Sequence, residues 1–242
     1  MKQSHFYNSR LAKVPWLIRR FGLRQMLLVP IRRLLAARII KGLPKVAFSF
    51  DGERLFYFYH RYNLTWINER AVEVPIAMKY VRAVDEGQVL EIGNVLSHYY
   101  PVRHTILDKY EAGPGITNCD IVDFTPERSF GLIISISTFE HIGFDDDAPT
   151  SSGSKIAAAV RHVRGLLSPG GKAVLTVPIG YNPELDEMLR ASRLETSREL
   201  YLVRTGRREW ISASKETALQ CRFNRPLPYA NAIAIVEFEQ IH

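Results

Sequence analysis

The chain has 242 residues, which is enough for one sizeable α/β domain and too few for two full domains. Hydrophobic residues make up 46% of it and charged residues 24%; this is the composition of a globular protein and excludes a disordered chain. The two cysteines, Cys119 and Cys221, exclude a disulfide framework and favour a reducing compartment. We therefore expect a cytoplasmic protein.

The positive charge of the chain is concentrated at its N-terminus. Residues 1–45 contain eleven Lys or Arg and no Asp or Glu, so that the net charge of +7 leaves a mildly acidic remainder. Basic and apolar clusters alternate over residues 10–42, which predicts two short amphipathic helices interrupted near Pro30. We divide the chain accordingly into a basic N-terminal extension, residues 1–45, and a main domain, residues 46–242.

The extension is expected to bind an anionic membrane surface peripherally, because large aliphatic residues are grouped beside its arginines. No apolar run approaches the roughly 20 residues that a transmembrane helix needs. Nucleic acid is an alternative partner, since the same charges would meet phosphates. A second alternative is that the helices pack over the main domain as a lid, with their arginines in solvent.

The main domain begins with a predicted β-hairpin at residues 46–59, where apolar segments flank the turn dipeptide Asp51-Gly52. A helix is expected from about residue 68 to 84, with Pro75 inside it. From residue 88 onward, strand-length apolar runs alternate with turns and helical stretches, which predicts a doubly wound, mostly parallel α/β sheet. The expected strands are residues 88–92, 105–107, 120–122, 132–137 and 172–177, with a helix at 155–167, a hairpin at 200–212 and a last strand at 232–238.

Two acidic residues lie at the ends of neighbouring predicted strands. Glu91 precedes Gly93-Asn94, and Asp108 ends the next strand 17 residues after Glu91. Open parallel sheets bind ligands at the carboxyl ends of their strands, where a glycine lets the backbone approach a ligand closely. An acid at about this spacing hydrogen-bonds ribose hydroxyls in nucleotide-binding sheets. The pattern indicates a nucleotide-type cofactor; the alternative is two ordinary strand-end acids.

Polar residues also follow the later strands. Asp120 is placed to accept the exocyclic amino group of an adenine, and the alternative is ordinary loop polarity. The apolar run of the fourth predicted strand ends at Ile136, so Ser137, Glu140 and His141 are expected just beyond the carboxyl end of this strand. Histidine is the common general base near neutral pH. The alternative for Glu140 and His141 is that they cap a helix or loop.

Taken together, these stretches resemble the class I S-adenosylmethionine-dependent methyltransferases over roughly residues 70–240. Leu90-Glu91-Ile92-Gly93 is similar to the cofactor loop of that family, Asp108 to its ribose-binding acid and Asp120 to its adenine-side acid. Residues 130–141 resemble its fourth motif. The most specific match is the turn Leu167-Ser168-Pro169-Gly170-Gly171 with the strand that follows it.

The resemblance implies a Rossmann-like, seven-stranded sheet with an antiparallel hairpin at its C-terminal edge and core motifs at residues 88–178. It implies an enzyme that uses S-adenosyl-L-methionine. The cofactor-binding residues that it implies are Glu91, Gly93, Asn94, Asp108, Asp120 and Ser137. The family's loop usually carries three alternating glycines, whereas Val95 and Ser97 stand at the second and third of those positions here.

Two alternatives to a methyltransferase remain at this point. A non-catalytic member of the same fold, which binds the cofactor or a partner, would explain the missing glycines. An NAD-dependent oxidoreductase would share the sheet and the ribose acid, but it should show Gly-x-Gly-x-x-Gly, which this loop lacks.

Methyl transfer needs a nucleophile held about 3 Å from the methyl group, and a hydroxyl nucleophile also calls for a base. His141 is the candidate base, with Glu140 as its orienter or as a substrate contact. Tyr181 and Asn182 are candidates for the acceptor pocket, and packing is an alternative for Tyr181. The residues after Ile136 lack the Asn/Asp-Pro-Pro-Tyr motif of enzymes that methylate adenine or glutamine amino groups. We therefore expect transfer to oxygen on a small molecule or a glycan. The acidic run 145–147 has side chains that can bind a divalent metal, but such a run is usually a solvated loop, and we expect no metal.

Overall fold

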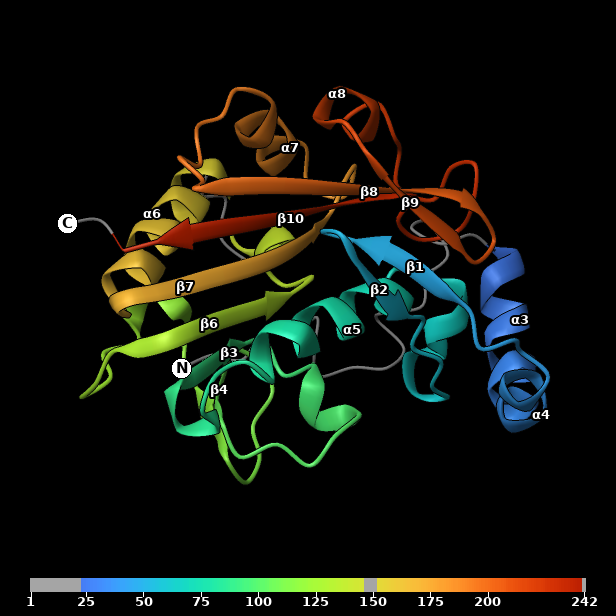
Figure 1. Ribbon diagram of the computed structural model, residues 1–242, viewed down its shortest axis with the longest axis horizontal. Coiled ribbons are helices and arrows are strands. Elements are labelled where there is room, and N and C mark those ends of the chain that lie inside the picture. Colours follow the sequence, from blue (N-terminus) through green and yellow to red (C-terminus); the bar gives the residue numbers. More distant parts are fainter. Residues whose placement is uncertain (1–22, 146–151, 241–242) are drawn as a thin grey trace.

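The computed structural model describes residues 23–145 and 152–240 (Figure 1). The described residues form one eight-stranded sheet and one separate two-stranded hairpin. The sheet consists of β3 (Val89–Ile92), β4 (Thr105–Asp108), β5 (Ile116–Asn118), β6 (Phe130–Ile136), β7 (Leu167–Pro178), β8 (Arg198–Gly206), β9 (Glu209–Ala213) and β10 (Ala232–Glu239). Their order across the sheet is β5-β4-β3-β6-β7-β10-β8-β9.

The first five strands in this order are parallel, whereas β10 runs antiparallel to both β7 and β8. The predicted α/β class, the mostly parallel sheet and the antiparallel C-terminal edge are thereby confirmed. The expected number of seven strands was wrong, because β9 pairs with β8 and adds an eighth strand at the edge.

The third expected strand was also misplaced. Residues 121–123 form the short 3-10 helix η4 (Ile121–Asp123), and the Asp120 carboxylate caps it by accepting the backbone N–H of Val122. The strand in this region is β5, which pairs Ile116 with Ile106. The apolar pair at Ile121 and Val122 is too short to define a strand, and a turn is enough to bury Ile121.

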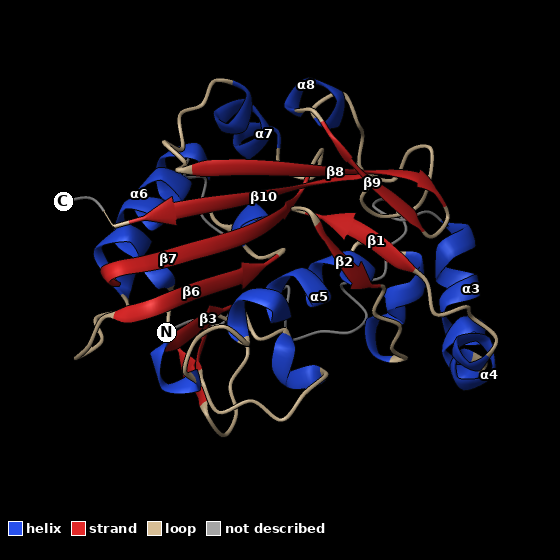
Figure 2. Ribbon diagram, in the orientation of Figure 1, coloured by secondary structure: helices blue, strands red, loops and turns tan. Residues whose placement is uncertain are grey.

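Helices cover both faces of the sheet (Figure 2). On one face lie α5 (Arg70–Val81) and the hairpin of β1 (Ala47–Phe50) and β2 (Glu53–Phe56), whose apolar side chains pack on Ile134, Ile136 and Ile235. On the other face lie α6 (Ser152–Gly165) and α7 (Pro183–Arg190), which pack on Ile133 and Leu175. The short α8 (Lys215–Ala218) follows β9. The other 3-10 helices of the described residues are η1 (Tyr62–Ile67), η2 (Glu86–Gln88), η3 (Leu96–His98) and η5 (Phe139–His141).

The described part of the N-terminal extension, from residue 23 onward, forms the helices α3 (Leu23–Leu34) and α4 (Ala36–Lys41). The break was expected near Pro30, but Pro30 lies within α3 and the irregular residue is Leu35. A proline removes one N–H donor and bends a helix without necessarily ending it. The part of the extension at residues 1–22 lies outside the described residues. Within the described part of the chain, no helix has the length and apolar character needed to cross a membrane.

Candidate functional site

A buried carboxylate, that of Glu91, binds the backbone of the loop after β3. Glu91 has no exposed surface, and its Oε1 accepts the backbone N–H groups of Val95 at 2.9 Å and Leu96 at 2.8 Å. Its Oε2 lies 2.7 Å from Nε2 of the equally buried His104. Glu91 therefore supports the loop from inside the sheet, and the surface of the loop is formed by the residues that follow it.

Gly93 lets two strand ends approach each other. Its φ is +86°, a conformation that residues with a side chain rarely adopt. A Cβ at this position would lie 3.0 Å from Cβ of Thr138 and would overlap the Thr138 hydroxyl. The glycine therefore allows close contact between the end of β3 and the residues after β6.

Asp108 ends β4 beside this loop and holds it by hydrogen bonds. Its Oδ2 accepts the backbone N–H of Asn94 at 2.9 Å, and its Oδ1 accepts those of Tyr110 and Glu111. An ionised carboxylate has about four acceptor positions, so three backbone donors leave capacity for a further one. Asp108 is half-buried, at the carboxyl end of its strand. Its position fits the acceptor of a ribose hydroxyl.

Asp120 lies farther along the same edge and forms ion pairs with two lysines. Its Oδ2 contacts Nζ of Lys155 at 2.8 Å and Nζ of Lys109 at 3.0 Å. Although burial acts against ionisation, the hydrogen bonds and charges of both lysines lower the pKa of Asp120 below its ordinary value. The structure thus gives Asp120 an ion-paired role at this edge, which the sequence did not indicate.

Beyond β6, the structure brings Glu140, His141, Asp145 and Tyr181 together. His141 Nδ1 is hydrogen-bonded to Asp145 Oδ2, and its Nε2 lies 3.6 Å from Glu140 Oε1. The hydroxyl of Tyr181 donates to the same Asp145 oxygen at 3.1 Å, and its ring packs edge-on against the His141 ring. Four groups that can exchange or share protons therefore lie in one contiguous set at the carboxyl edge of the sheet.

The pKa values of Glu140 and His141 are both raised above their ordinary values. Burial raises the pKa of Glu140 to about 7, against the opposing charge of His141. Burial acts to lower the pKa of His141, but the hydrogen bond to Asp145 and the Glu140 charge outweigh it and raise that pKa. Oε2 of Glu140 is buried and has no hydrogen-bond partner among the described residues. A buried acid with a free oxygen and a near-neutral pKa is a typical feature of a functional site.

A second buried group, which the sequence analysis missed, lies under the same edge. Glu73 of α5 is fully buried, and its Oε1 accepts hydrogen bonds from Ser137 at 2.6 Å and Thr176 at 2.8 Å. Its Oε2 pairs with Arg70 one turn earlier. Ser137, expected at the cofactor, is thus tied to α5, with a positive φ of 40°. The available signal was a single acid within the apolar stretch of residues 71–77.

Asn182 joins the last strand of the site to the turn that carries Glu140. Its Oδ1 accepts the backbone N–H groups of Glu184 and Leu185 and so caps α7, while its amide donates to the carbonyl of Glu140. Only 1% of Asn182 is exposed, and Tyr181 is 6% exposed. Tyr181 and Asn182 thus lie beside His141 and Glu140 and are almost fully buried, and Asn182 acts on the position of Glu140.

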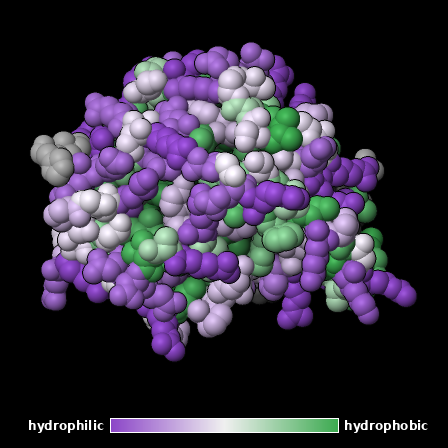
Figure 3. Space-filling view, in the orientation of Figure 1, coloured by the Kyte–Doolittle hydropathy of each residue, from purple (hydrophilic) through white to green (hydrophobic). Residues whose placement is uncertain are grey.

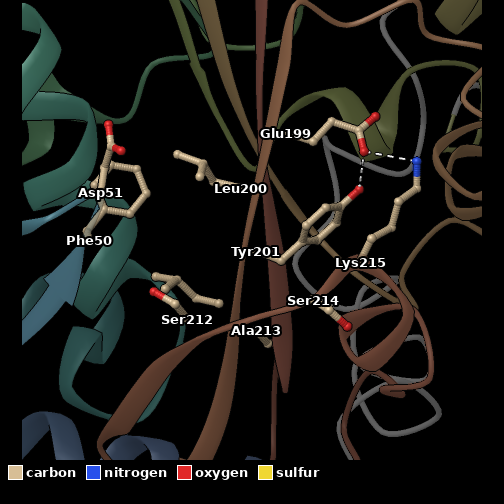
Figure 4. A pocket seen from close by; sticks show the side chains of 10 residues that line it. Phe50, Asp51, Glu199, Leu200, Tyr201, Ser212, Ala213, Ser214 and Lys215 are labelled. Carbon is tan, nitrogen blue, oxygen red and sulfur yellow. Dashed lines mark hydrogen bonds and ion pairs between the residues drawn. The ribbon is translucent and has the colours of Figure 1, made fainter.

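A separate hollow of about 310 Å³ lies between β1, β8, β9 and α8. Figure 4 shows the side chains that line it. Its polar groups bind one another: Glu199 accepts from Tyr201 at 2.6 Å and pairs with Lys215 at 2.9 Å. None of the residues proposed for the cofactor or the base lines it. The hollow therefore belongs to the packing of the C-terminal edge.

No family model matches the chain, and a search of curated proteins finds no match. Among solved structures, N-methyltransferase NodS from Bradyrhizobium japonicum, in complex with S-adenosyl-L-homocysteine, is similar at 14% identity and a TM-score of 0.41, covering 72% of this chain and 88% of that one. A possible histamine N-methyltransferase from Thermotoga maritima aligns at 10% identity and a TM-score of 0.41, covering 67% and 87%.

A third similar structure is an S-adenosylmethionine-dependent methyltransferase from Clostridium acetobutylicum, at 14% identity and a TM-score of 0.37, covering 69% of this chain and 89% of that one. At identities of 10–14% and TM-scores of 0.37–0.41, the similarity to these proteins does not extend to their activities.

Proposed function

We propose that the chain is an S-adenosyl-L-methionine-dependent methyltransferase that acts on oxygen, in a small molecule or a glycan. The observation that carries the proposal is that the Asp108-supported loop and the Glu140–His141 pair lie at the same edge of a sheet with this strand order. A cofactor site and a proton acceptor at one edge are the two parts that methylation of a hydroxyl requires.

The residues of the loop fit a nucleoside cofactor. Gly93 and Asn94 form a turn whose backbone is held in place by Asp108, and that carboxylate retains acceptor capacity for a ribose. The cofactor supplies an electrophilic methyl group on a positively charged sulfur. The charges of Glu73, Glu69 and Glu140 raise the pKa of the Arg70 guanidinium against the effect of its burial, so this edge holds several interacting charged groups.

Glu140 and His141 are proposed to handle the proton of the acceptor hydroxyl. A pKa of about 7 leaves Glu140 substantially ionised near neutral pH while it still binds a proton readily. Asp145 binds Nδ1 of His141, and Tyr181 binds the same Asp145 oxygen. These contacts orient the His141 ring. Glu140 is accordingly proposed as the base that touches the acceptor, with His141 as its partner. The sequence analysis had assigned these roles the other way round, with His141 as the base and Glu140 as its orienter.

One specific observation favours a non-catalytic alternative. Thr138 occupies the space directly over Gly93, and Val95 and Ser97 replace the family's later glycines. A protein that has lost catalysis could retain this loop for another purpose.

Isothermal titration with S-adenosyl-L-methionine, S-adenosyl-L-homocysteine and NAD tests the proposal. Binding of the first two and not of NAD is expected, whereas binding of none of them would contradict a methyltransferase. The acceptor atom is then tested by transfer of a labelled methyl group to a panel of hydroxylated sugars and small molecules, with matched amines beside them. Methylation of the amines alone would overturn transfer to oxygen while leaving the methyltransferase in place.

A further inference from the structure

The helices α3 and α4 carry two apolar faces. Val29, Ala36, Ile39 and Ile40 face the main domain and pack around Leu64 and Trp66 of η1 (Tyr62–Ile67). This inward face accounts for the attachment of the helices, and it agrees with the alternative that they cover the domain.

The opposite face is apolar as well and faces away from the domain. Ile31 is 54% exposed, Leu34 is 85% exposed and Leu35 is 45% exposed. Residues three and four apart lie on one side of a helix, so these three form a continuous stripe. Figure 3 shows hydrophobic residues among hydrophilic ones at the end of the molecule that α3 and α4 occupy in Figure 1. Packing over the domain needs one apolar face and leaves this second stripe unexplained.

The charge around the stripe has one sign. Arg33, Arg38, Lys41 and Lys45 are exposed on the same two helices and the segment after them, and neither helix contains an acid in its first turn. The whole extension has eleven basic and no acidic residues, whereas the rest of the chain has 21 basic and 25 acidic ones. An anionic surface would therefore attract this end of the molecule and repel the remainder, which defines an orientation.

We propose that the stripe of Ile31, Leu34 and Leu35, with the surrounding Arg33, Arg38, Lys41 and Lys45, docks on an anionic lipid surface. Large aliphatic side chains enter the boundary between headgroups and acyl chains, while lysines and arginines remain at the headgroups. Nucleic acid would use the same charges but would leave the aliphatic stripe in water. A second copy of the chain would cover the stripe but would bring two basic surfaces together.

The test is flotation of the full-length protein with vesicles of equal parts phosphatidylglycerol and phosphatidylcholine. We expect the protein to float at low salt and to remain in solution at about 1 M salt, where the Debye length falls to about 3 Å. The double variant Ile31→Asp, Leu34→Asp should reduce the bound fraction at least tenfold. Arg33→Gln with Arg38→Gln should reduce it as well, and vesicles of phosphatidylcholine alone should bind little of the wild type.

Two matched controls separate the docking surface from general effects. Ile211→Asp introduces a charge at another exposed aliphatic residue, which is 46% exposed on β9. Arg190→Gln with Arg193→Gln removes two exposed positive charges from the region of α7. Both controls should float like the wild type, and near-ultraviolet circular dichroism should show that all variants are folded.

Several results would overturn the proposal. These are failure of the wild type to float, equal flotation with neutral vesicles, or loss of binding in the controls as large as that in the Ile31 and Leu34 variant. A dimer in solution that this variant dissociates, without vesicle binding by the wild type, would assign the stripe to a second copy. Retention of binding by the variant would likewise remove the stripe from the docking surface.

Discussion

The side-chain amide of Asn182 donates a hydrogen bond of 3.0 Å to the backbone carbonyl of Glu140, which lies 42 residues earlier in the chain. The carbonyl oxygen of the same amide caps α7. One buried residue thus fixes the start of a helix and the position of the turn that carries the proposed base. The two roles involve different atoms of one side chain, the amide nitrogen and the amide oxygen.

We expect Asn182→Ala to lower the free energy of unfolding by about 1–3 kcal/mol, because the cap and a buried hydrogen bond are both lost. The variant should also lower kcat without changing the Kd of S-adenosyl-L-methionine, since Asn182 lies on the β7 side of the site. Ser214→Ala is the matched control, because Ser214 caps α8 in the same way. It should lower stability and leave kcat unchanged; an equal loss of kcat in both variants would mean that Asn182 acts through stability alone.

Glu140→Gln should change the pH dependence of stability. The folded-state pKa of about 7 lies above the ordinary value of 4.5, so the folded protein binds this proton more tightly than the unfolded chain does. The wild type therefore loses stability as pH rises from about 4.5 to 7, by up to about 3 kcal/mol, and the uncharged Gln does not incur this loss. The free energy of unfolding of the variant minus that of the wild type should therefore be larger at pH 8 than at pH 5.

The same variant should lower kcat by about 10²–10⁴-fold if Glu140 is the base. Denaturant unfolding at the two pH values and initial rates with an identified acceptor measure the two effects. Glu187→Gln, at a carboxyl that is half exposed, serves as the control and should show neither. A stability difference that is the same at both pH values would refute the raised pKa.

His141→Ala should lower kcat about 10²–10⁴-fold and leave S-adenosyl-L-methionine binding unchanged, because its contacts are to Glu140, Asp145 and Tyr181. Asp145→Asn should give a smaller loss, since the ring is then still held by Tyr181 and Glu140. Titration calorimetry and rate measurements on both variants check this order. A His141 variant with the wild-type rate would make the residue structural.

The parts of the fold that could be predicted are those with a local signal. The dipeptide Asp51-Gly52 marks the turn of the β1–β2 hairpin. The hairpin expected at residues 200–212 is formed by β8 and β9, but its turn lies at Arg207-Arg208, because Gly206 still pairs with Glu209. Apolar runs of strand length located β3, β4, β6, β7 and β10, because buried strands of a parallel sheet are continuously apolar. The strand β5 lacked this signal, since Ile116 is followed by Thr117 and Asn118, which are exposed.

The parts of the site that could not be predicted depend on contacts between distant residues. Thr176 and Glu73 are 103 residues apart in sequence and 2.8 Å apart in the structure, and no local pattern joins them. The two lysines on Asp120 come from the end of β4 and from α6. By contrast, the position of Glu140 and His141 just beyond β6 could be predicted from the sequence, because the length of the strand fixes where its last apolar residue lies.

Asp108→Asn should weaken S-adenosyl-L-methionine binding by about 1–3 kcal/mol. The substitution replaces one carboxylate oxygen of Asp108 by an amide NH₂ group. This donor then faces another donor, the backbone N–H of Asn94 or of Tyr110, and a hydrogen bond is lost. Titration calorimetry measures the change in Kd. Asp123→Asn removes an exposed carboxylate near the same edge and should leave Kd unchanged. An unchanged Kd in the folded Asp108 variant would remove this residue from the cofactor site.

Gly93→Ala should lower the free energy of unfolding by more than the positive φ alone explains. The cost of the φ of +86° is measured by Gly115→Ala, because Gly115 has a φ of +78° and a Cβ there would meet nothing within 4 Å. At Gly93 the new methyl group would also overlap Thr138, so Gly93→Ala should cost at least about 1 kcal/mol more than Gly115→Ala. Combining Gly93→Ala with Thr138→Gly should recover that excess, and the two changes should be coupled by about 0.5–3 kcal/mol in a double-mutant cycle. Denaturant unfolding of the three single variants and the double variant gives these values. If Gly93→Ala costs no more than Gly115→Ala, or if removal of Thr138 recovers nothing, the close approach of β3 and β6 is not what requires a glycine at this position.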